Sequence, residues 1–296
     1  HCARIFGKDA GLFVPSGSMG NEVCLAALTA PGEEVIVEEG CHIIDAEVGA
    51  PATINHVILR PLGSVRGVFD LDELAAAIRP PNRFFTHTSL MCVENTHQAH
   101  GGAVIPIDSF RAMCKIARER GVRVHLDGAR IFNASVASGV PVSDYAVEVD
   151  TLSFCFSKGL GAPIGSMVVG PTDVVDRARR ARKMFGGGMR QVGVIAAAAR
   201  LAVDTMVERL HDDHVNARRL GDGLASFTSI DPASIETNIV YVDTADRTAS
   251  EVASALAARG VNVGPMGTHR IRMVTHKDVD ADDVERAVDA FRDVLA

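Results

Sequence analysis

Apolar residues recur in two rhythms through the first two hundred residues of the chain. Short runs rich in β-branched and aromatic residues predict strands, and apolar residues spaced three and four positions apart predict helices. The predicted strands are residues 34–38, 56–59, 89–94, 122–126 and 151–156. The predicted helices are residues 21–29, 71–78, 107–120 and 173–183. Because strands that alternate with helices form right-handed βαβ units, this region predicts an α/β fold with a mostly parallel sheet flanked by helices.

The pattern changes near residue 205. A long helical stretch with alternating charges is predicted over residues 194–226, and a βαββα pattern follows it. Its predicted strands are residues 238–242, 261–263 and 270–274, and its predicted helices are 250–259 and 281–295. A chain of 296 residues has room for about two domains. We therefore expect a large α/β domain over residues 1–205 and a small C-terminal α+β domain over residues 206–296.

Composition narrows the class of protein. Hydrophobic residues make up 47% of the chain and charged residues 23%, which allows a large core and excludes disorder for most of its length. The 30 basic and 37 acidic side chains leave a net charge of −7, which gives no electrostatic footprint for nucleic acid. No run approaches the roughly 18 continuous apolar residues of a membrane span. We expect neither a nucleic acid nor a membrane as partner.

The cysteines and the first residue bear on the cellular compartment. Six cysteines are scattered without a CxxC pair, which is typical of reduced, buried thiols in a cytoplasmic protein. The sequence begins at His1 with no methionine, charged segment or hydrophobic segment typical of a signal peptide. We therefore expect a cytoplasmic protein, of which this sequence is a part.

Three motifs place polar residues at the ends of predicted elements. In PSGSMGN, Gly17 and Ser18 open a helix, where free amides and a hydroxyl either bind phosphate or form an ordinary N-cap. Asp127 follows strand 122–126 and faces the ligand crevice of an open α/β sheet, unless it forms an ion pair or a helix cap. Lys158 follows strand 151–156 among apolar residues and glycines, where desolvation makes an amine nucleophilic, although a lone loop lysine is normally solvated. In this order the three match the parts of a pyridoxal phosphate (PLP) enzyme, with lysine as Schiff-base amine and the acid on the pyridinium nitrogen.

Six motifs in order resemble the threonine aldolase family of fold-type-I PLP enzymes. They are PSGSMGN, VENTHQ, HLDGARIFNA, SKGLGAPIGS, RKMFGGGMRQ and RMVTH, and they run over nearly the whole chain with similar spacing. The resemblance implies a large PLP-binding domain like that of aspartate aminotransferase and a small C-terminal domain. It also implies a lyase that cleaves L-threonine or L-allo-threonine, or related β-hydroxy-α-amino acids, to glycine and an aldehyde.

The resemblance implies roles for residues around the cofactor. Lys158 would bind PLP covalently, Asp127 would contact its pyridine nitrogen, and Arg130 would lie beside the ring oxygen and the substrate carboxylate. Gly17 and Ser18 would bind the phosphate, with serine where the family often has threonine.

Further roles follow from the same resemblance. His42 matches the histidine that stacks over the ring, although it could merely begin a helix, and Glu47, about a turn later, would orient a water. Arg272 in RMVTH would bind the substrate carboxylate, for which a guanidinium is suited by its bidentate geometry. Lys183 and Arg190 match residues that reach the PLP phosphate from a neighbouring subunit; without the resemblance, a solvated basic helix would be preferred.

The sequence departs from the family in two places. Family members carry an N-terminal segment, with an Arg-Ser-Asp-Thr motif and a Gly-Asp-Asp stretch, that helps to build the substrate site, and this sequence begins after it. Many members also have a histidine four residues before a Thr-Ser/Lys-Leu sequence, which is Thr88-Ser89-Leu90 here, and that histidine touches the substrate hydroxyl. Phe84 stands at that position here. We assign the role to the nearby His87, which together with His42 is a candidate for the catalytic base.

Two HxxH pairs carry no prediction of a metal site. His97 and His100 have no matching carboxylate or cysteine cluster in the sequence, and neither do His211 and His214, which we expect on an exposed helix face.

The implied partners are a small amino-acid substrate and further copies of the chain. If Lys183 and Arg190 act across subunits, a dimer is the minimum unit, and the family commonly forms homotetramers. Other activities stay open on the same scaffold, namely β-elimination, cleavage of phenylserine-type substrates and transaldol exchange. A catalytically silent binding module is a remote alternative, against which the intact Lys158, Asp127 and Arg272 argue.

Overall fold

A computed structural model describes residues 1–295 of the chain. It divides into two compact units, and the first contains His1–His100 and Val104–Val207. The second contains Gly101–Ala103 and the chain from Glu208 onward. The sections below treat each unit by itself.

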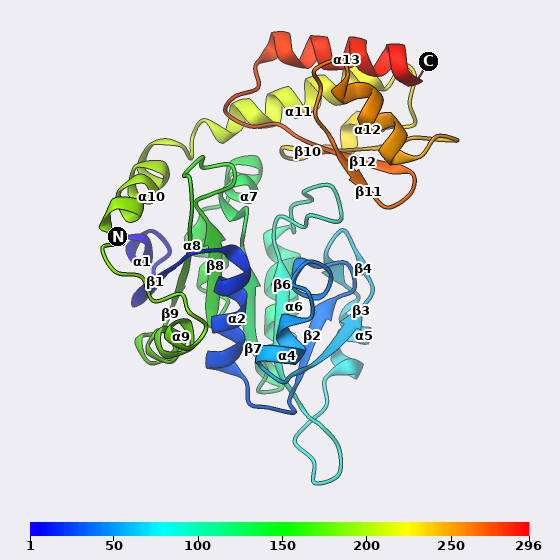
Figure 1. Cartoon of the computed structure of the whole chain (residues 1–296). Coiled ribbons are helices and arrows are strands. Elements are labelled where there is room, and N and C mark those ends of the chain that lie inside the picture. The colour runs from blue at the N-terminus through cyan, green and yellow to red at the C-terminus, as the bar shows by residue number, and fades with distance from the viewer. Residues whose placement is uncertain (296) are drawn as a thin grey trace. The chain divides into compact units, whose positions relative to one another are not determined.

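A seven-stranded sheet in the order β1-β9-β8-β7-β6-β2-β3 forms the centre of the first unit (Figure 1). Its strands are β1 Ala10–Val14, β2 Glu34–Glu38, β3 Ile58–Leu62, β6 Thr88–Glu94, β7 Arg123–Asp127, β8 Thr151–Cys155 and β9 Ser166–Gly170. Every pair from β8 to β3 is parallel, whereas β9 is antiparallel to both of its neighbours. The predicted α/β class with a mostly parallel sheet is confirmed.

The sequence pattern missed β1 and β9. Each of these strands contains a glycine and begins with a weak β former, Ala10 in β1 and Ser166 in β9. Neither segment therefore shows a strong run of β-branched residues. The two strands pair antiparallel at one edge of the sheet. Ala10 lies opposite Gly170, and Val14 lies opposite Ser166.

Helices cover both faces of this sheet, and every residue of β2 and β6 is therefore buried. Val35 and Val37 belong to a core cluster together with residues of α2 and α9, whereas Ile36 points to the other face. Contacts join α2 to α4 and α9, and separately join α6 to α5 and α8 (Figure 1). The helices are α1 Cys2–Ile5, α2 Gly17–Leu28, α3 His42–Asp45, α4 Ala50–Ile54, α5 Leu71–Ala77, α6 Ile107–Glu119, α7 Ile131–Ser138, α8 Val142–Ala146, α9 Thr172–Met184 and α10 Gly193–Thr205.

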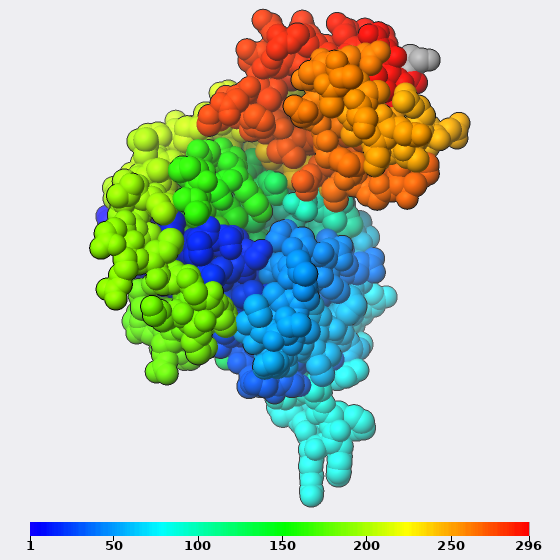
Figure 2. Space-filling view, in the orientation of Figure 1, coloured from blue at the N-terminus to red at the C-terminus, as the bar shows by residue number. Residues whose placement is uncertain are grey.

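A segment between α5 and β6 projects from the first unit, and Figure 2 shows it in cyan at the bottom of the view. Phe84 and Phe85 in this segment are 79% and 71% exposed. A short hairpin, β4 Ser64–Val65 with β5 Val68–Phe69, lies elsewhere on the same unit.

The second unit packs helices on a three-stranded antiparallel sheet in the order β10-β12-β11. Its elements are α11 Leu210–Leu224, a short 3₁₀ turn Pro232–Ser234, β10 Ile239–Asp243, α12 Ala249–Ala257, β11 Gly264–Met266, β12 Arg270–Val274 and α13 Ala281–Leu295. Buried apolar residues of α11, β10, α12, β12 and α13 form one core.

Two predicted elements are wrong. The long helix over residues 194–226 is two helices, because the chain leaves helical geometry between Thr205 and Leu210, where neither glycine nor proline signals a break. The strand predicted at 261–263 lies at Gly264–Met266. It is an edge strand that pairs only with β12, which explains why Pro265 is tolerated there.

Among residues 1–295, none of the helices is both long and apolar enough to cross a membrane. All six cysteines are buried free thiols.

Candidate active site

Lys158 lies in the loop that connects β8 to β9. The backbone amides of Phe156 and Ser157 donate to the carbonyl of Gly165 at 3.0 and 3.3 Å, and these bonds close the loop. Gly165 has φ +110°, and a Cβ there would lie 2.2 Å from the ring of Phe13, so only glycine fits this position. The loop therefore holds the half-buried Lys158 just beyond the carboxyl end of β8.

Asp127 is the last residue of the neighbouring strand β7 and is only 4% exposed. Its Oδ1 accepts from the amide of Ala129 at 3.0 Å, and its Oδ2 accepts from Nδ2 of Asn21 at 2.8 Å. Burial by itself raises the pKa of Asp127, but the positive charges of Lys158 and His42 and the Asn21 hydrogen bond outweigh it, so the pKa is lowered. The charge of Lys158 thus helps to keep the buried carboxylate of Asp127 ionised.

Asn21 organises the groups behind Asp127, although the sequence motif gave it no role. Its Nδ2 also donates to Oε1 of Glu47 at 2.8 Å, and its Oδ1 accepts from Oγ of Ser153 at 2.9 Å. Nε2 of His125 lies 3.1 Å from the same Oδ1. Burial lowers the pKa of His125 to about 4, so this imidazole is neutral. The signal that could have identified Asn21 is an amide side chain in the first turns of a helix whose second half is apolar.

His42 begins α3, and its Nδ1 lies 2.9 Å from Oε1 of Glu47. This hydrogen bond, with the charge of Asp127, raises the pKa of His42 although burial lowers it. The backbone amide of His42 donates to Oε2 of Glu94 at 2.6 Å, and Glu94 is the last residue of β6. Glu47 lies just after α3 rather than on it. The structure therefore brings His42, Glu47, Asn21 and Asp127 into one hydrogen-bonded group.

Gly17 and Ser18 form the first turn of α2, after the N-cap Ser16. The amide of Met19 donates to Oγ of Ser16 at 3.2 Å and that of Gly20 donates to its carbonyl at 3.1 Å, which leaves the amides of Gly17 and Ser18 directed outward from the helix end. A Cβ on Gly17 would lie 3.0 Å from Sγ of Cys155, so the close approach of α2 to β8 requires glycine. The predicted N-cap and the predicted anion cradle are both compatible with this geometry.

The four remaining basic residues of the predicted site lie on or near α7, α9 and β12. Arg130 is the half-buried N-cap of α7, three residues after Asp127. Lys183 in the last turn of α9 and Arg190 in the loop after it are exposed, and no contact described for residues 1–295 joins them to Asp127. Arg272 lies on β12 of the second unit, opposite Tyr241 of β10.

The structure does not bring His87 to this group. His87 directly precedes β6, whereas the site lies where β6 ends and Glu94 pairs with Asp127. The seven residues of β6 separate the two ends by roughly 20 Å. Nε2 of His87 instead lies 3.4 Å from Oε1 of Glu33, so His87 is not part of the proposed site.

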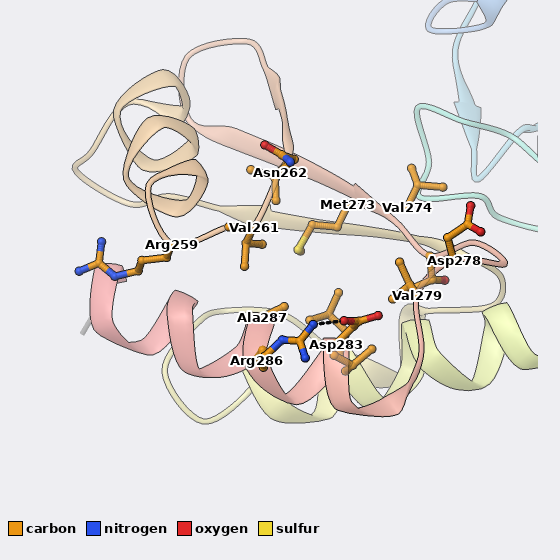
Figure 3. A pocket seen from close by; sticks show the side chains of 15 residues that line it. Arg259, Val261, Asn262, Met273, Val274, Asp278, Val279, Asp283, Arg286 and Ala287 are labelled. Carbon is orange, nitrogen blue, oxygen red and sulfur yellow. Dashed lines mark hydrogen bonds and ion pairs between the residues drawn. The ribbon is translucent and has the colours of Figure 1, made fainter.

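Figure 3 shows a cavity of about 300 Å³ within the second unit. Apolar side chains such as Val261 and Met273 line it, together with an ion pair between Asp283 and Arg286. None of the residues predicted to bind cofactor or substrate lines this cavity.

The group in the first unit fits pyridoxal phosphate by its own chemistry. An amine at a strand end suits the aldehyde, a buried ionised carboxylate suits a protonated pyridine nitrogen, and a glycine-serine helix start suits a phosphate. The fold and these donors define a PLP-dependent enzyme of fold type I.

The comparisons with known proteins agree with this class. Residues 1–247 match the model of the family described as beta-eliminating lyase, and the chain belongs to that family. It is 40% identical to the probable low-specificity L-threonine aldolase 2 of Arabidopsis thaliana, over 99% of this chain and 85% of the relative. It is 36% identical to the low specificity L-threonine aldolase of Escherichia coli (strain K12), over 100% of this chain and 87% of the relative. The threonine aldolase structure from Leishmania major has the same fold, with a TM-score of 0.83, 19% identity and coverage of 99% and 88% of the two chains.

A second carboxyl lies behind Glu47 and was not predicted. Glu22 on α2 is 4% exposed, and its Oε2 accepts from Nδ2 of Asn55. Burial, together with the hydrogen bond and charge of Glu47, raises the pKa of Glu22 to about 8. Glu22 is therefore protonated in the folded protein at neutral pH.

This protonation predicts a pH dependence of stability. The pKa of Glu22 is about 8 when folded and about 4.3 when unfolded, so its contribution to stability is lost as the pH rises between these values. The loss is of the order of several kcal/mol at most. We expect Glu22→Gln to flatten the decline in the free energy of unfolding between about pH 5 and pH 8, measured by urea denaturation. The exposed Glu39→Gln serves as control, and a wild type that is equally stable at both pH values would contradict the shift.

Proposed function

We propose that this protein is a PLP-dependent aldolase that cleaves L-threonine or L-allo-threonine to glycine and acetaldehyde. The observation that carries the proposal is the buried Asp127 at the end of β7, kept ionised in part by the charge of Lys158 just beyond the end of the neighbouring strand β8. The aldolase names of relatives that match the chain almost end to end support the choice of reaction.

Each residue of the site has a task in this reaction. The cofactor, when bound, accepts the electron pair released as the Cα–Cβ bond breaks. Lys158 would hold the cofactor covalently in the resting enzyme. Asp127 would keep the pyridine nitrogen protonated, and the amides of Gly17 and Ser18 would bind the phosphate.

Other residues act on the substrate and on protons. His42 would lie against the cofactor ring, and with Glu47, whose Oε1 lies 2.9 Å from its Nδ1, it would take the hydroxyl proton directly or through water. Arg130 of the first unit and Arg272 of the second unit are the two residues that we assign, each by itself, to the substrate carboxylate, because a guanidinium can donate to a carboxylate with bidentate geometry.

The organisation of the protein follows the same proposal. Residues 1–205 form the large cofactor-binding domain and residues 206–296 the small domain. Lys183 and Arg190 reach the phosphate in a partner subunit, so the enzyme is a homo-oligomer, at least a dimer and on this proposal a tetramer. The six buried free thiols support a reducing compartment such as the cytoplasm.

β-Elimination is the second candidate, because the matching family is described as beta-eliminating lyase. The same donors would serve that reaction, which releases ammonia and pyruvate or another 2-oxo acid instead of glycine and an aldehyde. The products separate the two activities.

The test uses the purified protein with added PLP and each substrate diastereomer separately. We expect PLP-dependent formation of acetaldehyde and glycine in equal amounts from at least one of them. Ammonia and 2-oxo acid in place of acetaldehyde would support β-elimination. Absence of any PLP-dependent product would overturn both proposals.

Arg272→Lys tests the carboxylate contact. Lysine keeps the charge but loses the bidentate geometry, so we expect KM for the amino acid to rise by about tenfold with a smaller change in kcat. The matched control is Arg270→Lys on the same strand, where Arg270 pairs with Asp243 at 2.8 Å. Equal KM values for the two variants would remove Arg272 from the substrate site.

A further inference from the structure

Two histidines and a glutamate meet at the carboxyl end of β2, apart from the lysine and carboxylate described above. Glu38 ends β2, and His97 and His100 lie in the loop that follows β6. Nε2 of His97 lies 2.9 Å from Oε2 of Glu38, and Nε2 of His100 lies 3.1 Å from Oε1 of the same carboxylate. The sequence offered only the HxxH pair, because its carboxylate partner comes from a strand 62 residues away.

The protein around this cluster is ordered by contacts of its own. Oγ of Ser64 in the β4–β5 hairpin donates to Oε1 of Glu38 at 2.9 Å and lies 3.3 Å from Nε2 of His100. The amide of Gly40 donates to Oε2 of Glu38 at 2.7 Å. The carboxylate is therefore fixed in place before any ligand binds.

His97 has a buried ring that lacks hydrogen bonds within the described part of the chain. Its side chain is 0% exposed, yet neither ring nitrogen forms a hydrogen bond with any residue from 1 to 295. The contact with Glu38 is short but too bent to count as a hydrogen bond. A buried ring nitrogen without a hydrogen bond costs free energy, and a cation bound at Nε2 would remove that cost for Nε2.

We propose that Glu38, His97 and His100 bind a divalent transition-metal ion of the zinc type. Two imidazole nitrogens and one carboxylate are a ligand set that Zn²⁺ accepts, with the fourth position left to water or to the Ser64 hydroxyl. Ligands at 2.0–2.1 Å from a tetrahedral ion lie roughly 3.3 Å apart, so the observed separations of 2.9, 3.1 and 3.3 Å need only small adjustments. His100 is 31% exposed, which gives the ion a path from solvent.

The ion would join three segments that are distant in sequence. It would tie the end of β2 to the loop after β6, and that loop is also held by the amide of Gln98, which donates to Glu94 at 2.8 Å. Since Glu94 in turn accepts from the amide of His42, the metal would stabilise the surroundings of the cofactor site without entering the reaction. The site is independent of which PLP reaction the protein catalyses.

Zinc binding to the PLP-loaded full chain tests the proposal. After chelation and dialysis, we expect the wild type to bind one Zn²⁺ per chain at saturation and to melt at higher temperature with zinc than without. We expect His100→Gln and Glu38→Gln to weaken zinc binding by more than about tenfold, as loss of a direct ligand must exceed the effect of a supporting residue. Metal content after equilibrium dialysis and the zinc-dependent shift in melting temperature are the measurements.

The second HxxH pair supplies the matched control. His211 and His214 share the three-residue spacing but belong to no cluster of candidate metal ligands found among residues 1–295. His211→Gln should therefore leave zinc binding unchanged. The proposal is wrong if the wild type binds no zinc, or if His100→Gln binds it as tightly as the wild type. Should Glu38→Gln fail to fold, the half-exposed His100 variant decides the question by itself.

Discussion

Lys158→Ala is expected to abolish aldehyde release from the amino-acid substrate. Lys158 lies just beyond the end of β8, its charge lowers the pKa of Asp127, and its loss would remove both the covalent attachment of the cofactor and a positioned proton carrier. The rate should fall by at least about 10²–10⁴-fold, the range that one positioned acid–base group contributes. Acetaldehyde release from the PLP-saturated protein, followed as initial rates, measures this loss.

Two controls separate chemistry from folding and from cofactor loss. Lys115→Ala, at an exposed lysine on α6, should keep wild-type activity. The cofactor should still bind to Lys158→Ala through its phosphate and ring contacts, but a visible absorption band dependent on covalent attachment should disappear. A Lys158→Ala protein with full activity would remove Lys158 from the mechanism and, with it, the class of reaction proposed here.

The sequence predicted the strands whose residues are all buried. β2, β6 and β8 lie within one residue of their predicted positions, because unbroken apolar runs of this length have few alternatives to a central parallel strand. The prediction was weaker where tertiary packing, rather than the local sequence pattern, determines the secondary structure. β1 and β9 contain glycine, and the break between α10 and α11 has no local signal.

The candidate site divides in the same way. Asp127 and Lys158 could be identified because each follows a recognisable strand, and parallel strands end at one edge of the sheet. Asn21 and Glu38 could not, because their partners are set by the fold. Asn21 donates to a carboxylate 106 residues away, and Glu38 is 62 residues from His100. His87 was assigned to the site because it lies near a motif in the sequence. It lies at the opposite end of β6 from the site, and nearness in sequence does not determine which end of a strand a residue occupies.

Asp127→Asn is expected to have the second largest effect. Asparagine keeps the shape and can still accept from Asn21 or from Ala129, but it carries no charge to hold the pyridine nitrogen protonated. Removal of one preorganised electrostatic partner typically costs about 10²–10³-fold in kcat. The matched control is Asp150→Asn, because Asp150 accepts from Val124 near the opposite end of the same strand, at 2.7 Å, and should affect stability rather than kcat.

A readout other than rate distinguishes the electrostatic role of Asp127 from a structural one. Because the lowered pKa of Asp127 depends on the charges of Lys158 and His42, loss of the carboxylate should in turn lower the pKa of His42, which Asp127 raises. The acidic limb of the pH profile of kcat/KM should therefore move to lower pH if His42 acts as a base. An unchanged profile with an unchanged kcat would show that the carboxylate has no part in the reaction. A loss of kcat that glutamate at this position partly restores would instead establish that the charge itself, buried against Asn21, drives the chemistry of the site.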